Sequence, residues 1–166
     1  MTLVDWNAMS MNEAAQAILP CCGSSAWAAK LAGMRPFRSF EDLAAASDVV
    51  WWELPVVDWQ QAFDSHPRIG QGHAKAATAK SLAWSEGEQA AANPDELAKA
   101  RLAAGNAAYE ARFGRIFIVC ATGKSAGEML SILEGRMTND DATEMREAAE
   151  QQRLIMQLRL RKWLQS

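Results

Sequence analysis

The chain has 166 residues, of which 49% are hydrophobic and 22% are charged, and its formal net charge is −3. This composition excludes disordered and fibrous classes, and the length suits one domain with a conventional hydrophobic core. The acidic balance gives no general electrostatic reason to bind nucleic acid or an anionic membrane, so neither is expected as a partner.

Residues that start and stop helices recur along the whole chain. Ser10 and Glu13 form a capping-box pattern ahead of an apolar stretch that Pro20 ends. Gly33 is expected to end the next helix. In chain order, the predicted helices begin at Ser10, Ser24 or Ser25, Ser39, Pro55, Pro94, Ser125, and Asp140 or Asp141.

One stretch, residues 117–120, resembles a strand but has no clear second strand to pair with. A short apolar run cannot be distinguished from a buried helical piece by periodicity alone. We therefore predict an all-α fold, a single-domain multi-helix bundle over residues 1–166, in which this run is an extended or short helical core segment.

His66 lies in the segment Asp64-Ser65-His66-Pro67-Arg68, where an amphipathic helical pattern stops. Pro67 disfavours helical backbone at His66 and favours an extended conformation there. An imidazole beside Asp64 and Arg68 is suited to proton exchange near neutral pH. Two interpretations stay open: a functional histidine, or a surface histidine in a turn that ends a helix.

The segment Ser85-Glu86-Gly87-Glu88-Gln89 offers a hydroxyl, a carboxylate and an amide within one helical turn. Ser85 and Glu88 have the spacing of a capping box, which is a purely structural interpretation. Alternatively, backbone N–H groups at a helix start could bind an anion or a carbonyl oxygen. The preceding region, residues 70–80, is either a surface loop or a lid.

Residues 113–125 form a third segment of interest, because it is hydrophobic and then turns abruptly at Gly123. If the segment runs extended beside a pocket, its backbone groups are available to a ligand.

Cysteine usage favours a reducing compartment. Cys21, Cys22 and Cys120 are an odd number with an adjacent pair, which argues against a disulfide framework. No residues have metal-ligand spacing, and no apolar run is long enough for a membrane span. The N-terminus lacks the features of a signal peptide, and the C-terminus lacks a recognised targeting signal. We expect a cytoplasmic protein.

Together these segments closely resemble the OHCU decarboxylases, which convert 2-oxo-4-hydroxy-4-carboxy-5-ureidoimidazoline (OHCU) to (S)-allantoin in urate degradation. The resemblance extends from Trp6 and Asn7 over nearly the whole chain. The segments that carry it, in this order, are His66-Pro67 with Gly70, Ser85 with Glu88-Gln89, residues 113–125, Glu128 with Arg136, and Leu158-Arg159-Leu160.

The resemblance implies an all-helical domain, a homodimer, OHCU as substrate, and catalysis without a metal or an organic cofactor. His66 matches the catalytic histidine and proton donor of the family, and Glu88 is expected to act with it. Arg136, Arg153 and Arg161 stay open as alternatives to Arg159 for the substrate-binding arginine. The substrate-binding positions carried over are Pro67, Ser85, Glu88, Gln89, Ile118, Val119, Cys120, Ala121, Thr122 and Arg159.

Two other functions fit parts of the sequence. A non-enzymatic helical interaction module would use the tryptophans as a groove and Arg159 with Arg161 for an acidic partner. A hydrolase of a ureido compound would need a metal site or a nucleophile, and neither is apparent in the sequence. The acidic net charge and the grouping of His66, Ser85 and Glu88 favour the enzyme over the module.

Overall fold

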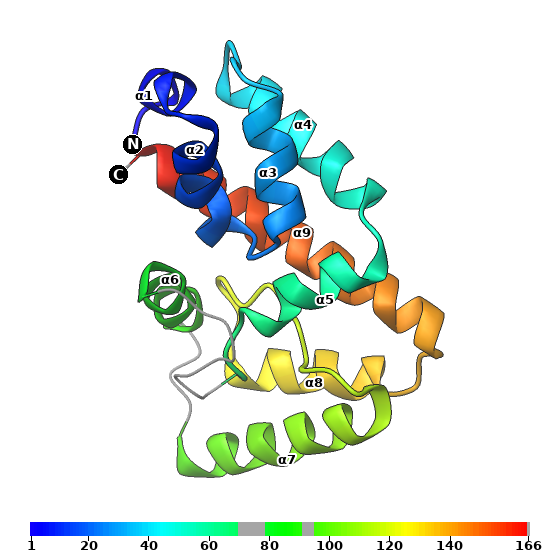
Figure 1. Cartoon of the computed structure of the whole chain (residues 1–166). Helices are drawn as coiled ribbons and strands as arrows, with labels where there is room; N and C mark the ends of the chain where they lie inside the picture. The colour runs from blue at the N-terminus through cyan, green and yellow to red at the C-terminus, as the bar shows by residue number, and fades with distance from the viewer. Residues whose placement is uncertain (70–78, 91–94, 166) are drawn as a thin grey trace. The chain divides into compact units, whose positions relative to one another are not determined.

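The computed structural model describes residues 1–69, 79–90 and 95–165. Within these ranges every regular element is a helix, so the predicted all-α class is confirmed (Figure 1). No helix among these residues combines the length and the hydrophobicity needed for a bilayer crossing. The elements are α1 (Leu3–Ala8), α2 (Met11–Ile18), the 3-10 helix η1 (Leu19–Cys21), α3 (Ser25–Gly33), α4 (Phe40–Glu53), α5 (Val56–Asp64), α6 (Ala79–Gln89), α7 (Glu96–Phe113), α8 (Ala126–Arg136) and α9 (Asp141–Gln165).

Helix starts follow the predicted capping residues. Ser10 caps α2, and the carboxylate of Glu13 accepts the Ser10 N–H in return, which completes the expected capping box. Ser24, Ser39 and Ser125 accept backbone N–H groups at the starts of α3, α4 and α8. These local bonds satisfy N–H groups that have no partner within a helix.

The chain forms two compact units. Unit 1 comprises Met1–Ala62 and Arg153–Ser166, and unit 2 comprises Phe63–Gln152. Helices α5 and α9 contribute residues to both units. The single domain expected over residues 1–166 stays a prediction.

Buried tryptophans form much of the core of unit 1. Trp6 meets Trp163 edge to face, with ring centroids 5.6 Å apart, and its indole N–H donates to the Ala14 carbonyl at 2.8 Å. The indole N–H of Trp27 donates to the Ser47 carbonyl at 3.2 Å. Each of these indole rings therefore buries a large apolar area while its polar group keeps a partner.

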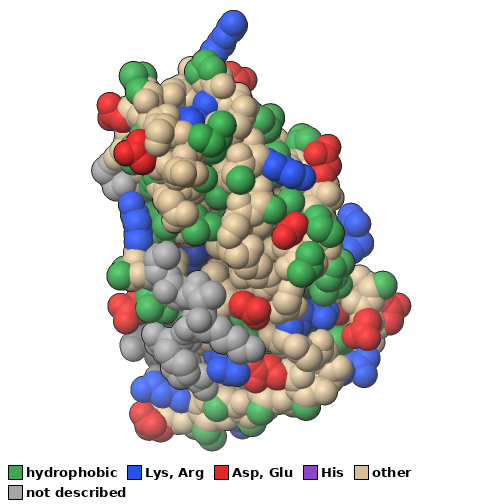
Figure 2. All heavy atoms as spheres, viewed as in Figure 1, with side chains coloured by type: hydrophobic (Ala, Val, Ile, Leu, Met, Phe, Trp, Pro, Cys, Tyr) green, Lys and Arg blue, Asp and Glu red, His purple; other side chains and the backbone are tan. Residues whose placement is uncertain are grey.

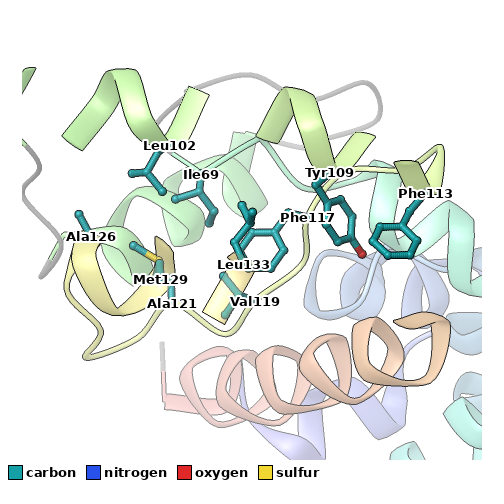
Figure 3. Close-up of a cluster of buried hydrophobic side chains, with 10 residues drawn as sticks. All are labelled: Ile69, Leu102, Tyr109, Phe113, Phe117, Val119, Ala121, Ala126, Met129 and Leu133. Carbon is teal, nitrogen blue, oxygen red and sulfur yellow. The ribbon is translucent and has the colours of Figure 1, made fainter. Parts of the chain in front are cut away.

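In unit 2 a second core lies between α7, α8 and the segment that connects them (Figure 3). Gly105 permits close packing of α7 on α8, because a Cβ at this position would lie 3.3 Å from the Leu133 side chain. Gly114 ends α7 in the left-handed conformation with a φ of 72°. The core residues are Ile69, Leu102, Tyr109, Phe113, Phe117, Val119, Ala121, Ala126, Met129 and Leu133.

Charged side chains of both signs are interspersed on the face of the molecule that Figure 2 shows. This mixture agrees with the small net charge of −3.

Candidate functional site

His66 follows directly on the last turn of α5. Its backbone N–H donates to the Phe63 carbonyl at 3.1 Å, and Pro67 behind it is buried. The His66 side chain is itself buried, at 8% exposure, so the interpretation as a surface histidine is wrong. Its Nε2 atom lies 2.6 Å from Oε1 of Gln152, a fully buried side chain of α9.

The residues after His66 are held by α7. Nε of Arg68 donates to Oε1 of Glu110 at 2.7 Å, and the Asn106 amide donates to the Ile69 carbonyl at 3.1 Å. Asn106 is buried, so its bond to the chain is shielded from water. Hydrogen bonds therefore fix the backbone at His66 and in the residues that follow it. Gly70 and most of the predicted loop 70–80 lie outside the described residues.

Helix α6 buries a polar face made of Ser81, Ser85 and Glu88. Residues at this spacing share one side of a helix, and the buried side of a helix usually carries apolar side chains. Buried hydroxyl and carboxylate groups cost free energy unless they are hydrogen-bonded, so these side chains need partners inside the protein or in a ligand.

The prediction of a capping box at Ser85 is wrong. The prediction that a helix begins there, with backbone N–H groups available to an anion, is wrong as well. Helix α6 begins at Ala79, so Ser85 lies in its interior. The Ser85 hydroxyl donates to the Ser81 carbonyl at 3.0 Å, four residues back in the same helix. Interior serines make this bond because the backbone N–H groups near them are already paired.

Residues 116–121 belong to neither a helix nor a strand, which settles the open choice for this run against a helical piece. Side chains satisfy much of its backbone. The guanidinium of Arg136 donates to the Ile118 carbonyl, Gln151 accepts the Cys120 N–H at 2.9 Å, and Lys124 donates to the Cys120 carbonyl at 2.7 Å. The stretch therefore has no regular secondary structure, and side chains from other segments satisfy its buried backbone.

Val119 differs from its neighbours in this stretch. The residue is only 4% exposed. No described residue accepts its N–H or donates to its carbonyl. Buried peptide groups almost always have a partner, so this residue is suited to bind a ligand through its backbone. Thr122, by contrast, is exposed.

Two of the motif segments of unit 2, those of Glu88 and Cys120, interact electrostatically. Burial raises the pKa of the Cys120 thiol, Lys124 lowers this pKa, and the Glu88 carboxylate also raises it, so Glu88 lies within electrostatic reach of Cys120. The same cysteine is bonded to Gln151, whose neighbour Gln152 contacts His66. Neither glutamine can be recognised from the sequence, because no motif distinguishes them from other polar residues of a long helix.

Arg159 belongs to unit 1, where it is fully buried and Nη1 donates to the Pro20 carbonyl at 3.3 Å. Its assignment to the substrate site stays a prediction. The alternatives have partners of their own: Arg136 binds Glu144, Arg153 binds Asp48, and the Arg161 guanidinium lies 4.6 Å from the Phe40 ring centroid.

Among the described residues there is no group of three or more His, Cys, Asp or Glu side chains that could hold a metal ion.

Comparison with known proteins decides the family. The family model for OHCU decarboxylase matches residues 7–161, which is nearly the whole chain. The chain belongs to the OHCU decarboxylase family. The resemblance predicted from the motifs is therefore confirmed.

Known members of the OHCU decarboxylase family agree in sequence and in fold. The chain is 36% identical over 144 residues to the uric acid degradation bifunctional protein TTL of Arabidopsis thaliana, an alignment that covers 86% of this chain and 44% of that protein. It is 34% identical over 134 residues to the 2-oxo-4-hydroxy-4-carboxy-5-ureidoimidazoline decarboxylase of Amia calva, covering 79% of this chain and 75% of that protein. The chain therefore spans less than half the length of the Arabidopsis relative.

A crystal structure of OHCU decarboxylase in the presence of (S)-allantoin has the same fold. It superposes with a TM-score of 0.78 at 32% identity and covers 89% of this chain and 96% of that one.

Proposed function

We propose that the chain catalyses the decarboxylation of OHCU to (S)-allantoin. Membership of the OHCU decarboxylase family supports the reaction class. The observation that carries the proposal is the juxtaposition in unit 2, where consecutive glutamines of α9 bind His66 and Cys120, and Cys120 lies within electrostatic reach of Glu88. A purely interacting helical module would not need a buried imidazole, a buried carboxylate and a supported backbone segment linked in this way.

The chemistry suits a site built from ordinary side chains. OHCU carries a carboxylate and a hydroxyl on one ring carbon, next to a ring C=N bond. When the carbon–carboxylate bond breaks and CO₂ leaves, its electron pair moves into the adjacent C=N and the ring nitrogen takes a proton. The hydroxyl then loses its proton as a carbonyl forms, and the former C=N carbon gains one. The net reaction consumes one proton, and the substrate itself serves as the electron sink.

His66 is the proposed proton donor to the former C=N carbon. Imidazole has an ordinary pKa of about 6.5, so it can both hold and release a proton near neutral pH. Delivery to one face of the planar carbon sets the stereochemistry of (S)-allantoin. Holding the ring in place is worth several kcal/mol of the barrier, because the donor and the carbon no longer need to find each other.

The other proposed contacts orient the substrate. Glu88 would accept a hydrogen bond from the substrate hydroxyl or a ureido N–H, and Ser85 and Gln89 would bind the remaining polar groups. The backbone of residues 118–122 would bind the ring, with the N–H and carbonyl of Val119 as the groups that no described residue uses.

Two further substrate-binding residues are proposed from the family resemblance. Pro67, which is buried, would form part of the wall beside the imidazole. Arg159 would anchor a carboxylate or carbonyl oxygen, because a guanidinium can donate two parallel hydrogen bonds.

The test uses freshly formed substrate. Urate oxidase and the hydrolase that follows it generate OHCU from urate, and circular dichroism then follows the allantoin formed. OHCU decays spontaneously to racemic product, so the wild-type chain should produce an optically active signal that the mixture without it lacks. His66→Asn should abolish the enantiomeric excess. Optical activity at the wild-type rate in this variant would remove His66 from the proton step.

The assembly and location of the enzyme are also proposals. We expect a homodimer, as the family resemblance implies, and light scattering of the purified chain at several concentrations tests it. We expect a cytoplasmic enzyme, which cell fractionation tests. The single domain over residues 1–166 should give one cooperative unfolding transition that is the same by fluorescence and by circular dichroism.

A further inference from the structure

The contact between His66 and Gln152 has a consequence for where the proton sits on the ring. Oε1 of Gln152 lies 2.6 Å from Nε2 of His66, and the Gln152 side chain is fully buried. A carbonyl oxygen can only accept a hydrogen bond, so Nε2 must carry a hydrogen to bond with it. In neutral imidazole the second nitrogen, Nδ1, then carries the lone pair.

We propose that Gln152 is a positioning residue that keeps a proton on Nε2 of His66, so that Nδ1 is the nitrogen that gains and loses the catalytic proton. The assignment of a catalytic proton rests on the proposed function of His66. The assignment of the tautomer does not, because it follows from the contact between the two side chains. Gln152 would act only through the imidazole, without touching the substrate.

Gln152 contacts the ring of His66 itself, whereas the other bonds described around this residue hold its backbone. The backbone N–H of His66 is bonded to Phe63, and the chain that follows is tied to α7 through Arg68 and Ile69. These bonds fix the position of the His66 backbone but not the rotation of its ring or the nitrogen that holds the proton. A buried hydrogen bond to one ring nitrogen fixes both, as partners of catalytic and metal-binding histidines do.

Nitrogen-15 NMR of the whole labelled chain reads the tautomer directly, because protonated and unprotonated ring nitrogens have widely separated chemical shifts. The chain has two histidines, so the imidazole signals that disappear in His66→Asn belong to His66. At a pH where the ring is neutral, the wild-type chain should show a proton on Nε2 and none on Nδ1.

Two substitutions of Gln152 separate its hydrogen bond from its bulk. Gln152→Met keeps the length of the side chain and removes the acceptor, so the His66 signals should become those of mixed tautomers. Turnover should fall about 10–100-fold, the usual effect of losing a partner that orients a functional imidazole. Gln152→Glu keeps an acceptor oxygen and should restore the Nε2–H tautomer.

Gln157→Met is the matched control on the same helix. Its amide donates to the Ala44 carbonyl, the Ser47 hydroxyl and Asp48, so the substitution removes side-chain hydrogen bonds of the same helix that do not involve the imidazole. This variant should lose stability and keep the wild-type His66 signals.

The proposal is overturned if the wild-type ring carries its proton on Nδ1, since the Gln152 amide would then present its NH₂ to Nε2. It is also overturned if Gln152→Met leaves the His66 signals unchanged. If Gln152→Met does not fold, the wild-type spectrum alone decides between the tautomers. A normal rate in His66→Asn would instead contradict the proposed function, while an Nε2–H signal in the wild type would still support the role of Gln152 at the ring.

Discussion

Arg136 and Glu144 form a buried ion pair in unit 2. Nε of Arg136 donates to Oε1 of Glu144 at 2.8 Å, and the two side chains are only 7% and 0% exposed. The same carboxylate accepts the hydroxyl of Tyr109 at 2.6 Å, while the guanidinium also donates to the Ile118 carbonyl. The pair therefore connects α7, α8 and α9 to the segment proposed to bind the substrate.

Replacing Arg136 by Met should cost about 3–5 kcal/mol of unfolding free energy, because it leaves the Glu144 carboxylate buried without its cation. Chemical denaturation followed by tryptophan fluorescence measures the change. Adding Glu144→Gln to this variant should recover part of the loss, since the uncompensated charge is then removed. A loss below about 1 kcal/mol for Arg136→Met would mean that water reaches the carboxylate.

The exposed pair Lys99 and Glu96 on α7 is the matched control for the buried one. Its atoms are 3.4 Å apart, and the side chains are 53% and 94% exposed. Lys99→Met should change the free energy of unfolding by less than about 1 kcal/mol. The difference in unfolding free energy between Arg136→Met and Lys99→Met then isolates the effect of burial.

Gln151 should matter for substrate binding more than for folding. Its Oε1 accepts the Cys120 N–H, and Gln151→Met removes that acceptor and loosens the backbone of the proposed ligand-binding segment. The substitution also removes the hydrogen bond that the Gln151 amide donates to Glu147 at 3.0 Å. We expect a KM for OHCU raised several-fold, with a stability loss of about 2 kcal/mol, since a hydrogen bond is usually worth about 1 kcal/mol net. Gln151→Glu keeps the acceptor for the Cys120 N–H and should restore KM, but it should remain less stable than the wild type because its carboxylate faces that of Glu147. A change confined to kcat would contradict this role.

The cysteines should react slowly with thiol reagents in the folded chain. Burial raises the pKa of Cys22 to about 12, although Arg159 lowers this pKa slightly, and burial also raises the pKa of Cys120. Only the thiolate reacts, and at pH 8 about one Cys22 thiol in ten thousand is ionised. The labelling rate should therefore rise with pH across the alkaline range, and all three cysteines should react at once in urea. Rapid labelling of native Cys22 near neutral pH would show that the turn after η1 opens.

Much of the fold could be predicted from local chemistry. The capping residues Ser10, Ser24, Ser39 and Ser125 each start a helix where expected, because an N-cap satisfies backbone N–H groups whatever the distant packing. The end of α5 before Pro67 was predictable for a similar reason, since a proline disfavours helix at the residue before it.

The predictions from sequence that were wrong or missing concern residues whose role depends on distant contacts. Ser85 has the spacing of a cap, but only the observed start of α6 at Ala79 shows that it lies in a helix interior. The contact of Gln152 with His66 joins residues 86 positions apart, and nothing in the local sequence predicts which glutamine of α9 meets the imidazole. Long-range placement of this kind follows from the packing of the whole unit.

Glu88→Gln tests the proposed carboxylate most directly, because it removes the charge and keeps the shape. Glu88 is 7% exposed on the polar face of α6, where a neutral amide is less costly to bury than a carboxylate. We therefore expect a fall of about 100-fold or more in kcat/KM for OHCU, with a Tm equal to or above that of the wild type. Glu86→Gln, exposed on the same helix, should change neither quantity. If Glu88→Gln lowered Tm and activity together, the carboxylate would be a structural partner within unit 2, and the proposal that it binds substrate would be withdrawn.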